Sequence, residues 1–209
     1  HHEMKTRDSL IWEVQPQDIL FANGIFTCSK NASDQLSFKD LARRQMGTGG
    51  PITCSTSAPS TGVGPVMAGT IADVEVDPET GKVEILRCTS FLDVGFPAHP
   101  SYVEGQIQGA TVQGIGWALN EEYVYNANGS LDNASFLDYR MPTSLDVPMI
   151  DSVMVTVPNP RHPFGLRGVG EAPIIPPLSA IHNAINDALG VRINSLPITP
   201  SKILSYLKK

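Results

Sequence analysis

The sequence is poor in cysteine and has no cluster of positive charge. Its three cysteines, Cys28, Cys54 and Cys88, are odd in number and widely spaced, which fits neither a disulfide framework nor a zinc or iron–sulfur ligand set. None of the 15 basic residues forms a block, and the net charge is -6, so nucleic acid is not an expected partner. We therefore expect a reducing, cytoplasmic location and no nucleic-acid partner.

Long apolar runs are also missing. No stretch reaches the length of a membrane span, and no signal peptide is recognisable in the sequence, so we expect no membrane partner. The opening residues 1–4 look like an added leader or a cut within a longer chain.

The composition is that of a loop-rich globular protein. Of the 209 residues, 41% are hydrophobic and 17% charged, and there are 18 glycines and 17 prolines. A chain of this length buries about 70% of its unfolded surface, so it can form a core without disulfides or structural metals. Neither a repeat nor a clear linker is visible, and we expect one domain over residues 1–209.

Alternation of apolar and polar residues predicts strands joined by tight turns. Asn23-Gly24 between two apolar runs predicts a hairpin over 19–28, because Asn-Gly supplies the positive φ angles of a type I′ turn. Alternation on both sides of a Pro-Glu-Thr-Gly turn predicts a strand pair over 70–86. We expect a third hairpin over 121–131 and a single strand over 152–157.

Helical spacing appears between these strands. The longest candidate covers 100–122, and shorter ones cover 37–47, 176–190 and the last ten residues. Ser37 and Gly47 are the expected caps of the 37–47 helix. Because strands and helices are mixed without a regular βαβ alternation, we expect an α+β fold in which mixed sheets with hairpins pack against a few helices.

The longest helix carries an unusual stripe. Gln106, Gly109, Ala110 and Gln113 follow the spacing of one helix face. Small residues let a ligand approach the backbone, and two amides suit a heterocycle whose edge alternates donors and acceptors. Alternatively, the small residues allow a tight crossing with another element and the glutamines are merely solvated.

A second candidate lies in the loop "VPNPRHPFGLRGVGEAP", residues 157–173. Prolines stiffen this loop while glycines allow unusual backbone angles. Glu171 follows Gly170 directly, and the apolar run 172–178 is expected to desolvate its carboxylate and raise its pKa, as a general base requires. Alternatively, Glu171 accepts backbone N–H groups at the start of the following helix.

Other chemistry is less favoured by the sequence. The Gly/Ser/Thr-rich stretch 47–65 lacks the Gly-Lys-Ser/Thr ending of a phosphate loop, and we interpret it as a connector. The histidines lack the spacing of a metal site. Cys54-Ser55-Thr56 has no base nearby, which argues against a hydrolase.

Several motifs together resemble a known family. "YVEGQIQGATVQGIGWALNEEYVY" (102–125), "NPRHPFGLRGVGEAP" (159–173) and "IHNAINDALG" (181–190) resemble the C-terminal part of the molybdenum-cofactor-binding large subunit of the xanthine dehydrogenase and aldehyde oxidase family. "ADVEVDPETGKVEILRCTSFLDVG" (72–95) is similar to the strand pair that precedes the Gly-Gln helix in that family. The resemblance covers most of the chain, from about Asp18 to the end.

The resemblance implies an oxidoreductase. In that family a molybdenum centre on a pterin hydroxylates an aldehyde or N-heterocycle with oxygen from water, and the glutamate of a Gly-x-Gly-Glu motif is the base. Glu171 matches that glutamate, and Gln106 matches a position that hydrogen-bonds the pterin. The backbone of Gly168, Val169 and Gly170 is expected to lie near the metal, and no side chain of this chain is an expected metal ligand. Gln113 is added as a cofactor contact from the helical stripe.

The resemblance also implies cofactors and partners. The expected cofactor is molybdenum–molybdopterin, with the cytosine dinucleotide as one candidate form, whereas iron–sulfur clusters and FAD are expected only on other subunits or domains. Expected partners are the remaining part of the molybdopterin subunit, iron–sulfur and flavin subunits, and a small-molecule substrate. The family's long N-terminal portion is not recognisable here, so we expect 1–209 to be the C-terminal part of a molybdopterin-binding domain, inactive by itself.

Two departures concern the substrate. Pro97-Ala98-His99-Pro100 stands where the family usually has Asn-Pro, and His162 replaces a commoner Asn, so the substrate cannot be inherited by analogy. Two hypotheses remain: a catalytic part of a molybdenum hydroxylase, or a noncatalytic assembly domain that keeps the fold without binding metal.

Overall fold

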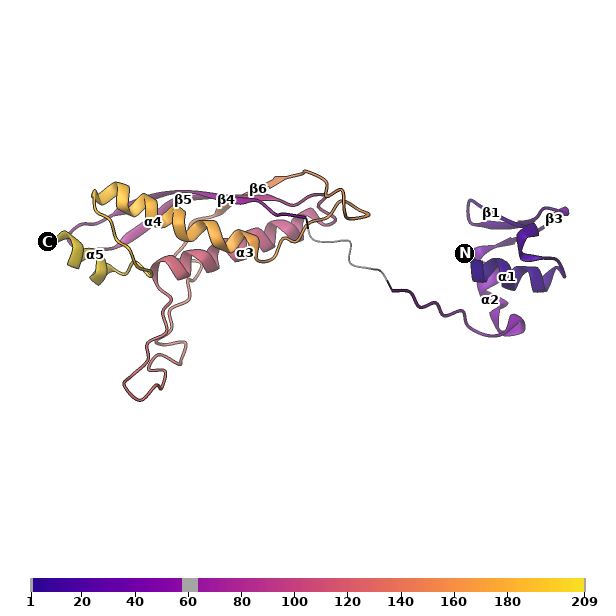
Figure 1. Cartoon of the computed structure of the whole chain (residues 1–209), viewed down its shortest axis with the longest axis horizontal. Helices are drawn as coiled ribbons and strands as arrows, with labels where there is room; N and C mark the ends of the chain where they lie inside the picture. Colours follow the sequence, from indigo (N-terminus) through magenta and orange to yellow (C-terminus); the bar gives the residue numbers. More distant parts are fainter. Residues whose placement is uncertain (1, 58–63, 209) are drawn as a thin grey trace. The chain divides into compact units, whose positions relative to one another are not determined.

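The computed structural model describes residues 2–57 and 64–208. The chain forms two compact units, His1–Pro59 and Ser60–Lys209, each described here by itself (Figure 1). Composition indicated no linker, so this division is a finding of the structure. The assignment of all of 1–209 to one molybdopterin-binding domain stays a prediction.

The first unit packs a small antiparallel sheet of order β1-β2-β3 against helices. Its core consists of Met4, Ile19, Phe26, Leu36 and Leu41. Its elements are α1 (His2–Ile11), η1 (Pro16–Asp18), β1 (Ile19–Ala22), β2 (Ile25–Cys28), β3 (Asn31–Ser37), α2 (Phe38–Arg43) and η2 (Gln45–Thr48).

Local signals predicted the hairpin and one cap in this unit. Asn23 and Gly24 have φ of 49° and 78° between β1 and β2, which confirms the turn, and the Ser37 side chain accepts a hydrogen bond from the Asp40 N–H at the start of α2. Gly47 as the C-cap is wrong, because α2 ends at Arg43 and the backbone tightens into a 3₁₀ turn. Helix α1 and strand β3 were not predicted, since neither carries a clear apolar period.

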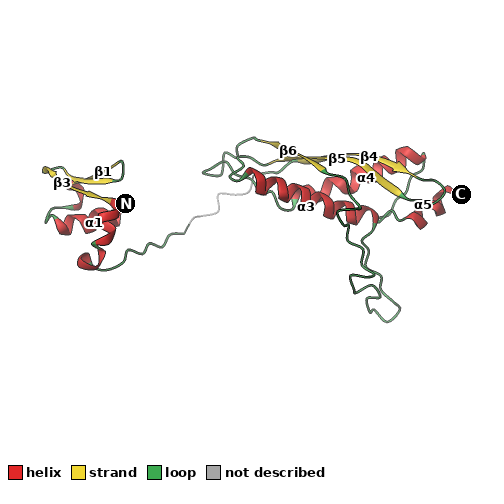
Figure 2. Cartoon of the chain, turned by 180° about the vertical axis from the view of Figure 1, so that it is seen from behind, coloured by secondary structure: helices red, strands yellow, loops and turns green. Residues whose placement is uncertain are grey.

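The second unit is a three-stranded sheet covered on one face by two long helices (Figures 1 and 2). Strands β4 and β5 are antiparallel, and β6 joins β5 in parallel. Helix α3 connects β5 to β6, so this part is a βαβ crossover. The elements are β4 (Ala68–Val76), β5 (Val83–Asp93), α3 (Pro100–Leu119), β6 (Ile150–Val155), η3 (Ala172–Ile174), α4 (Ile175–Leu189) and α5 (Pro200–Leu207).

The crossing of α3 and α4 depends on Gly114. A Cβ atom at this position would lie 2.5 Å from the Ile174 carbonyl oxygen and 3.0 Å from the Pro177 Cβ. Ile181 and Ile185 of α4 complete the core with residues of β5 and α3. The close approach at Gly114 holds η3 against α3, and η3 follows Glu171 directly.

The structure confirms most of the elements predicted for this unit. They are the strand pair over 70–86, the strand near 152–157 and the three helices. The hairpin over 121–131 is confirmed only in part. The chain reverses at Gly129, whose φ is 80°, and Tyr125 and Leu131 form an isolated antiparallel bridge, but no regular strands flank it. Residues 120–149 instead form a long irregular arm (Figures 1 and 2). It pairs with none of the strands in 2–57 and 64–208, and the side chains of Phe136, Leu137 and Leu145 are largely exposed.

The mixture of helices and two small sheets confirms the α+β class. Of the expected connector 47–65, residues 51–57 have no regular structure, and 58–63 lie outside the described residues. Within the described ranges, none of the helices is both long and apolar enough to cross a bilayer.

Candidate functional site

Glu171 stands at the junction between the glycine-rich turn and η3. Its side chain is exposed, and it makes no capping hydrogen bond to the helix that follows. Helix α4 begins after Ile174, whose side chain does not cap it either. The alternative role of Glu171 as a helix cap is therefore wrong.

The expected burial of this carboxylate is not provided by the apolar run 172–178. Pro173 and Pro177 are buried in the unit, but Ile175 is 70% exposed. Pro177 lies against Gly114 of α3, whereas Ile175, which shares a hollow with Glu171, is left in solvent. Burial of Glu171 would need atoms from outside the described residues.

A hollow of about 390 Å³ contains three of the predicted site residues. Gln113 and Trp117 of α3 line one part of it, and Gly170 and Glu171 line another, with Ile174 and Ile175 completing the wall. Trp117 follows Gln113 by one helical turn, so helical spacing could have identified it from sequence. The structure thus places the candidate base opposite an amide and beside apolar side chains.

A second hollow of about 210 Å³ contains Gln106 and Val169. The rings of His99 and Tyr102 lie at its rim, stacked with centroids 3.9 Å apart. Gly168 lines neither hollow. The two hollows are linked through Gln106, whose Oε1 lies 3.8 Å from the position of a Cβ on Gly170.

The small residues of the stripe do not serve a tight crossing within this chain. A Cβ on Gly109 would meet no atom within 4 Å, whereas the crossing with α4 uses Gly114. Gln106 and Gln113 are exposed. The face that carries both amides is therefore open to an external group.

The glycine turn is held by an ion pair that the sequence did not indicate. Arg167 Nε lies 3.0 Å from Asp93 Oδ2, and both side chains are nearly buried. Asp93 is the last residue of β5. The sequence signal that could have indicated this ion pair is Arg167 itself, a basic residue between glycines four positions before Glu171.

The surroundings of His162 and Cys88 indicate structural roles for these two side chains. His162 Nδ1 accepts the N–H groups of Phe164 and Leu166, which shapes its own loop, and burial raises the pKa of the Cys88 thiol to about 11. In the part of the chain that the structure describes, no three His, Cys, Asp or Glu side chains gather as metal ligands.

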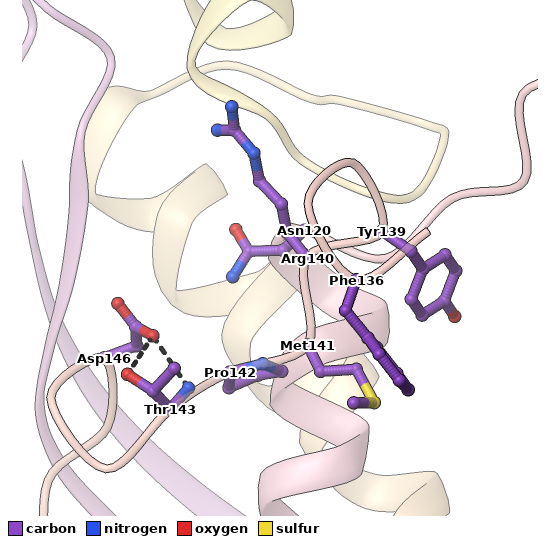
Figure 3. Close-up of a pocket in the computed structure, with 8 residues that line it drawn as sticks. All are labelled: Asn120, Phe136, Tyr139, Arg140, Met141, Pro142, Thr143 and Asp146. Atoms are coloured by element: carbon purple, nitrogen blue, oxygen red, sulfur yellow. Dashed lines mark hydrogen bonds between the residues drawn. The ribbon is translucent and has the colours of Figure 1, made fainter. Parts of the chain in front are cut away.

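A larger hollow, about 640 Å³, lies at the base of the arm and contains none of the predicted site residues. Figure 3 shows the side chains of Phe136 and Met141 pointing the same way and Arg140 pointing away from them. The Thr143 hydroxyl and N–H both donate to Asp146 at 2.7 Å. This hollow also contains a carboxylate and an amide, Asp146 and Asn120. The hydrogen bonds from Thr143 occupy the Asp146 carboxylate and lower its pKa, so we place the candidate site at Glu171.

Comparison with known proteins identifies the family. A family model described as "Molybdopterin cofactor-binding domain" matches residues 1–148, which include Gln106 and Gln113 but not Glu171. The chain is 39% identical over 172 residues to the xanthine dehydrogenase molybdenum-binding subunit of Escherichia coli O157:H7, covering 80% of this chain and 23% of that protein. It is 42% identical over 139 residues to the 6-hydroxypseudooxynicotine dehydrogenase complex subunit gamma of Paenarthrobacter nicotinovorans, covering 65% and 18%.

The fold is shared with a solved structure of the same kind. Quinoline 2-oxidoreductase from Pseudomonas putida 86 matches with a TM-score of 0.75 at 30% identity, over 100% of this chain and 28% of that one. The chain spans less than a quarter of the length of the two curated relatives named above. It belongs to the molybdopterin cofactor-binding domain family of the xanthine dehydrogenase and aldehyde oxidase type of molybdenum oxidoreductases.

Proposed function

We propose that this chain contributes the pterin-contacting helix and the catalytic base of a molybdenum hydroxylase that acts on an aldehyde or an N-heterocycle. The observation that carries the proposal is the carboxylate of Glu171, which makes no capping hydrogen bond to the following helix and shares a hollow with Gln113. Xanthine and quinoline, named for the relatives, are both N-heterocycles. The whole enzyme would include polypeptide beyond the quarter represented here.

The residues present fit the cofactor. The position of a Cβ on Gly109 or Gly168 faces open space, and a Cβ on Gly170 would meet only Gln106. A flat group could therefore approach the backbone closely at these positions. Gln106 and Gln113 would each offer an amide that both donates and accepts, which matches the alternating edge of a pterin.

The chemistry of the chain's own residues follows from this arrangement. When bound, the molybdenum cofactor would supply the centre that takes up electrons from the substrate and provides water-derived oxygen. Glu171 would accept a proton on a carboxylate oxygen, because no hydrogen bond from the described residues occupies that oxygen. Trp117 and Ile175 would exclude water from one side of the carboxylate once the remaining sides are covered.

The test is Glu171→Gln in the assembled enzyme. We expect turnover to fall by about 10²- to 10⁴-fold, the usual effect of losing a general base, while molybdenum content measured by elemental analysis stays unchanged. Glu79→Gln is the matched control, because Glu79 is exposed in the β4–β5 turn and its side chain is not part of either hollow. Near-normal turnover of Glu171→Gln would instead favour a noncatalytic assembly domain.

A further inference from the structure

The ion pair between Asp93 and Arg167 is supported by several further hydrogen bonds. The side chains are only 14% and 8% exposed, and Nε and Oδ2 are 3.0 Å apart. Asp93 Oδ1 also accepts the N–H groups of Gly95 at 3.1 Å and Val157 at 3.4 Å. Two charges this far from water are maintained only when such additional hydrogen bonds satisfy them.

Arg167 connects segments that are distant in sequence. Besides Asp93 at the end of β5, its guanidinium donates to the carbonyl of Val157, after β6, at 3.2 Å, and to the carbonyl of Pro65, before β4. Nε faces both Asp93 and the Val157 carbonyl, and Nη1 reaches the Pro65 carbonyl, a spread of donors that the single ammonium of a lysine could not provide. Arg167 therefore fixes the start of the glycine turn to the sheet.

Gly95 makes room for this attachment. Its φ is +64°, and a Cβ there would collide with the Gly165 carbonyl oxygen and would lie 3.0 Å from Arg167 Cγ and 3.2 Å from the Arg167 N atom. The Arg167 N–H in turn donates to the carbonyl of Val94 at 3.3 Å. Side chain and backbone of Arg167 are thus both bound to the end of β5.

Apolar contacts also hold the segment that carries the base, because Val169 and Ala172 pack against the core cluster of Leu92, Val94, Val103 and Ile107. Between Arg167 and the buried Pro173 lie Gly168 and Gly170, where an added Cβ would meet either no atom within 4 Å or only Gln106. Glycine populates many backbone conformations, so the backbone on either side of Val169 depends on how firmly the ends of the segment are fixed. Among the described residues, no side-chain hydrogen bond fixes Glu171 itself.

We propose that the Asp93–Arg167 ion pair positions Glu171 by anchoring the upstream end of the Gly168–Gly170 segment. This inference rests on the proposed function of Glu171 as base. Arg167 is a positioning residue, because it acts through the backbone and lines the Gln106 hollow, not the hollow that contains Glu171. A displacement of about 1 Å at a catalytic group can lower turnover by about 10²-fold.

The first test measures backbone order in the 209-residue chain labelled with ¹⁵N-glycine. In the parent chain we expect order parameters near 0.85 for Gly168 and Gly170, and values below about 0.6 in Arg167→Met. Gly114, in the α3–α4 crossing, should stay rigid in both. Arg140→Met is the matched control, because Arg140 is an exposed arginine of the arm.

Three results of this measurement would overturn the proposal. They are unchanged order in Arg167→Met, a segment that is already disordered in the parent chain, and loss of order at Gly114 as well, which would show a general folding role. If Arg167→Met does not fold, Arg167→Lys is used, which keeps the charge but not the fork. Unchanged order in a folded Arg167→Lys would then count against the proposal.

The second test uses the assembled enzyme and separates this inference from the proposed function. We expect Arg167→Met to lower kcat by about 10- to 100-fold with molybdenum content and KM little changed. In a Glu171→Gln background it should cause no further loss, because no base remains to be positioned. An equal loss of kcat in both backgrounds would refute the positioning role of Arg167. Near-normal turnover of Glu171→Gln would instead refute the role of Glu171 as base, and the order measurement would still test the anchoring of the segment.

Discussion

The side-chain oxygen of Gln106 lies 3.8 Å from the place that a Cβ atom on Gly170 would occupy. Gln106 lies in α3 and Gly170 in the glycine turn, and the α3–α4 crossing at Gly114 brings these segments together. The candidate cofactor contact and the candidate base therefore belong to one site, although 65 positions separate Gln106 from Glu171. This proximity allows the site to be tested by substitutions that leave the fold intact.

Gly170→Ala separates a cofactor role from a folding role. The new methyl group would make only an ordinary contact with Gln106, so we expect the thermal midpoint of the chain to be unchanged. In the assembled enzyme the methyl group would stand where a cofactor approaches the backbone. We expect cofactor affinity to fall about tenfold, which corresponds to a clash of about 1.4 kcal/mol. Gly69→Ala in β4, where the new Cβ would meet no atom within 4 Å, is the control. Unchanged cofactor content in Gly170→Ala would contradict close approach at Gly170.

Two glycines of α3 should respond in opposite directions to substitution by alanine. Gly114→Ala forces a Cβ against the Ile174 carbonyl, and we expect it to destabilise the chain by about 1–3 kcal/mol. Gly109→Ala adds a methyl group in open space and should stabilise by up to about 1 kcal/mol, because alanine favours helix more than glycine does. Urea denaturation measures both, and equal effects would mean that the crossing is not where we place it.

Asp8 should make the stability of the first unit depend on pH. It is fully buried in α1, neither carboxylate oxygen has a hydrogen-bond partner in the described residues, and burial raises its pKa to about 6, against a smaller opposing effect of Arg44. The folded chain therefore holds a proton between about pH 4 and 6 that the unfolded chain has released, so this contribution to stability is lost as pH rises through 6. Denaturation followed by Trp12 fluorescence in a Trp117→Phe background should show it.

The control for this pH dependence is a substitution at the same position. Asp8→Asn should remove the dependence between pH 4 and 7, whereas Glu13→Gln at an exposed site should retain it. If Asp8→Asn keeps the same slope with pH, another group is responsible.

Tyr139 should ionise at unusually high pH. Its hydroxyl donates to Glu121 Oε2 at 2.7 Å, and this hydrogen bond raises the pKa of Tyr139 to about 12, because loss of the proton would place two negative charges together. NMR titration of ring-labelled tyrosine should detect this resonance as the last to shift. In Glu121→Gln the pKa should fall toward its ordinary value of 10.0, and an unshifted titration would mean that the arm is not held by this contact.

Local elements were predictable where short-range physics decides them. The Asn23-Gly24 turn, the Ser37 cap and the Gly190 end of α4 each follow from one residue's backbone or hydrogen-bonding preference. The hairpin over 121–131 is reduced to an isolated bridge, because among the described residues no sheet lies beside it to bury its apolar side chains. Helix α1 was not predicted, because its buried residues are the polar Asp8 and Ser9 together with Met4, so no apolar stripe marks it in the sequence.

The sequence by itself determined the family, the α+β class and the identity of the candidate residues, because these depend on residue types at fixed local spacing. Only the tertiary structure decided which of those residues meet. It placed Gln113 in one hollow with Glu171 and Gln106 beside Gly170, and it revealed the buried Asp93–Arg167 ion pair. Spacing along a chain cannot encode these contacts, since they arise from the packing of α3 and the glycine turn against the end of β5.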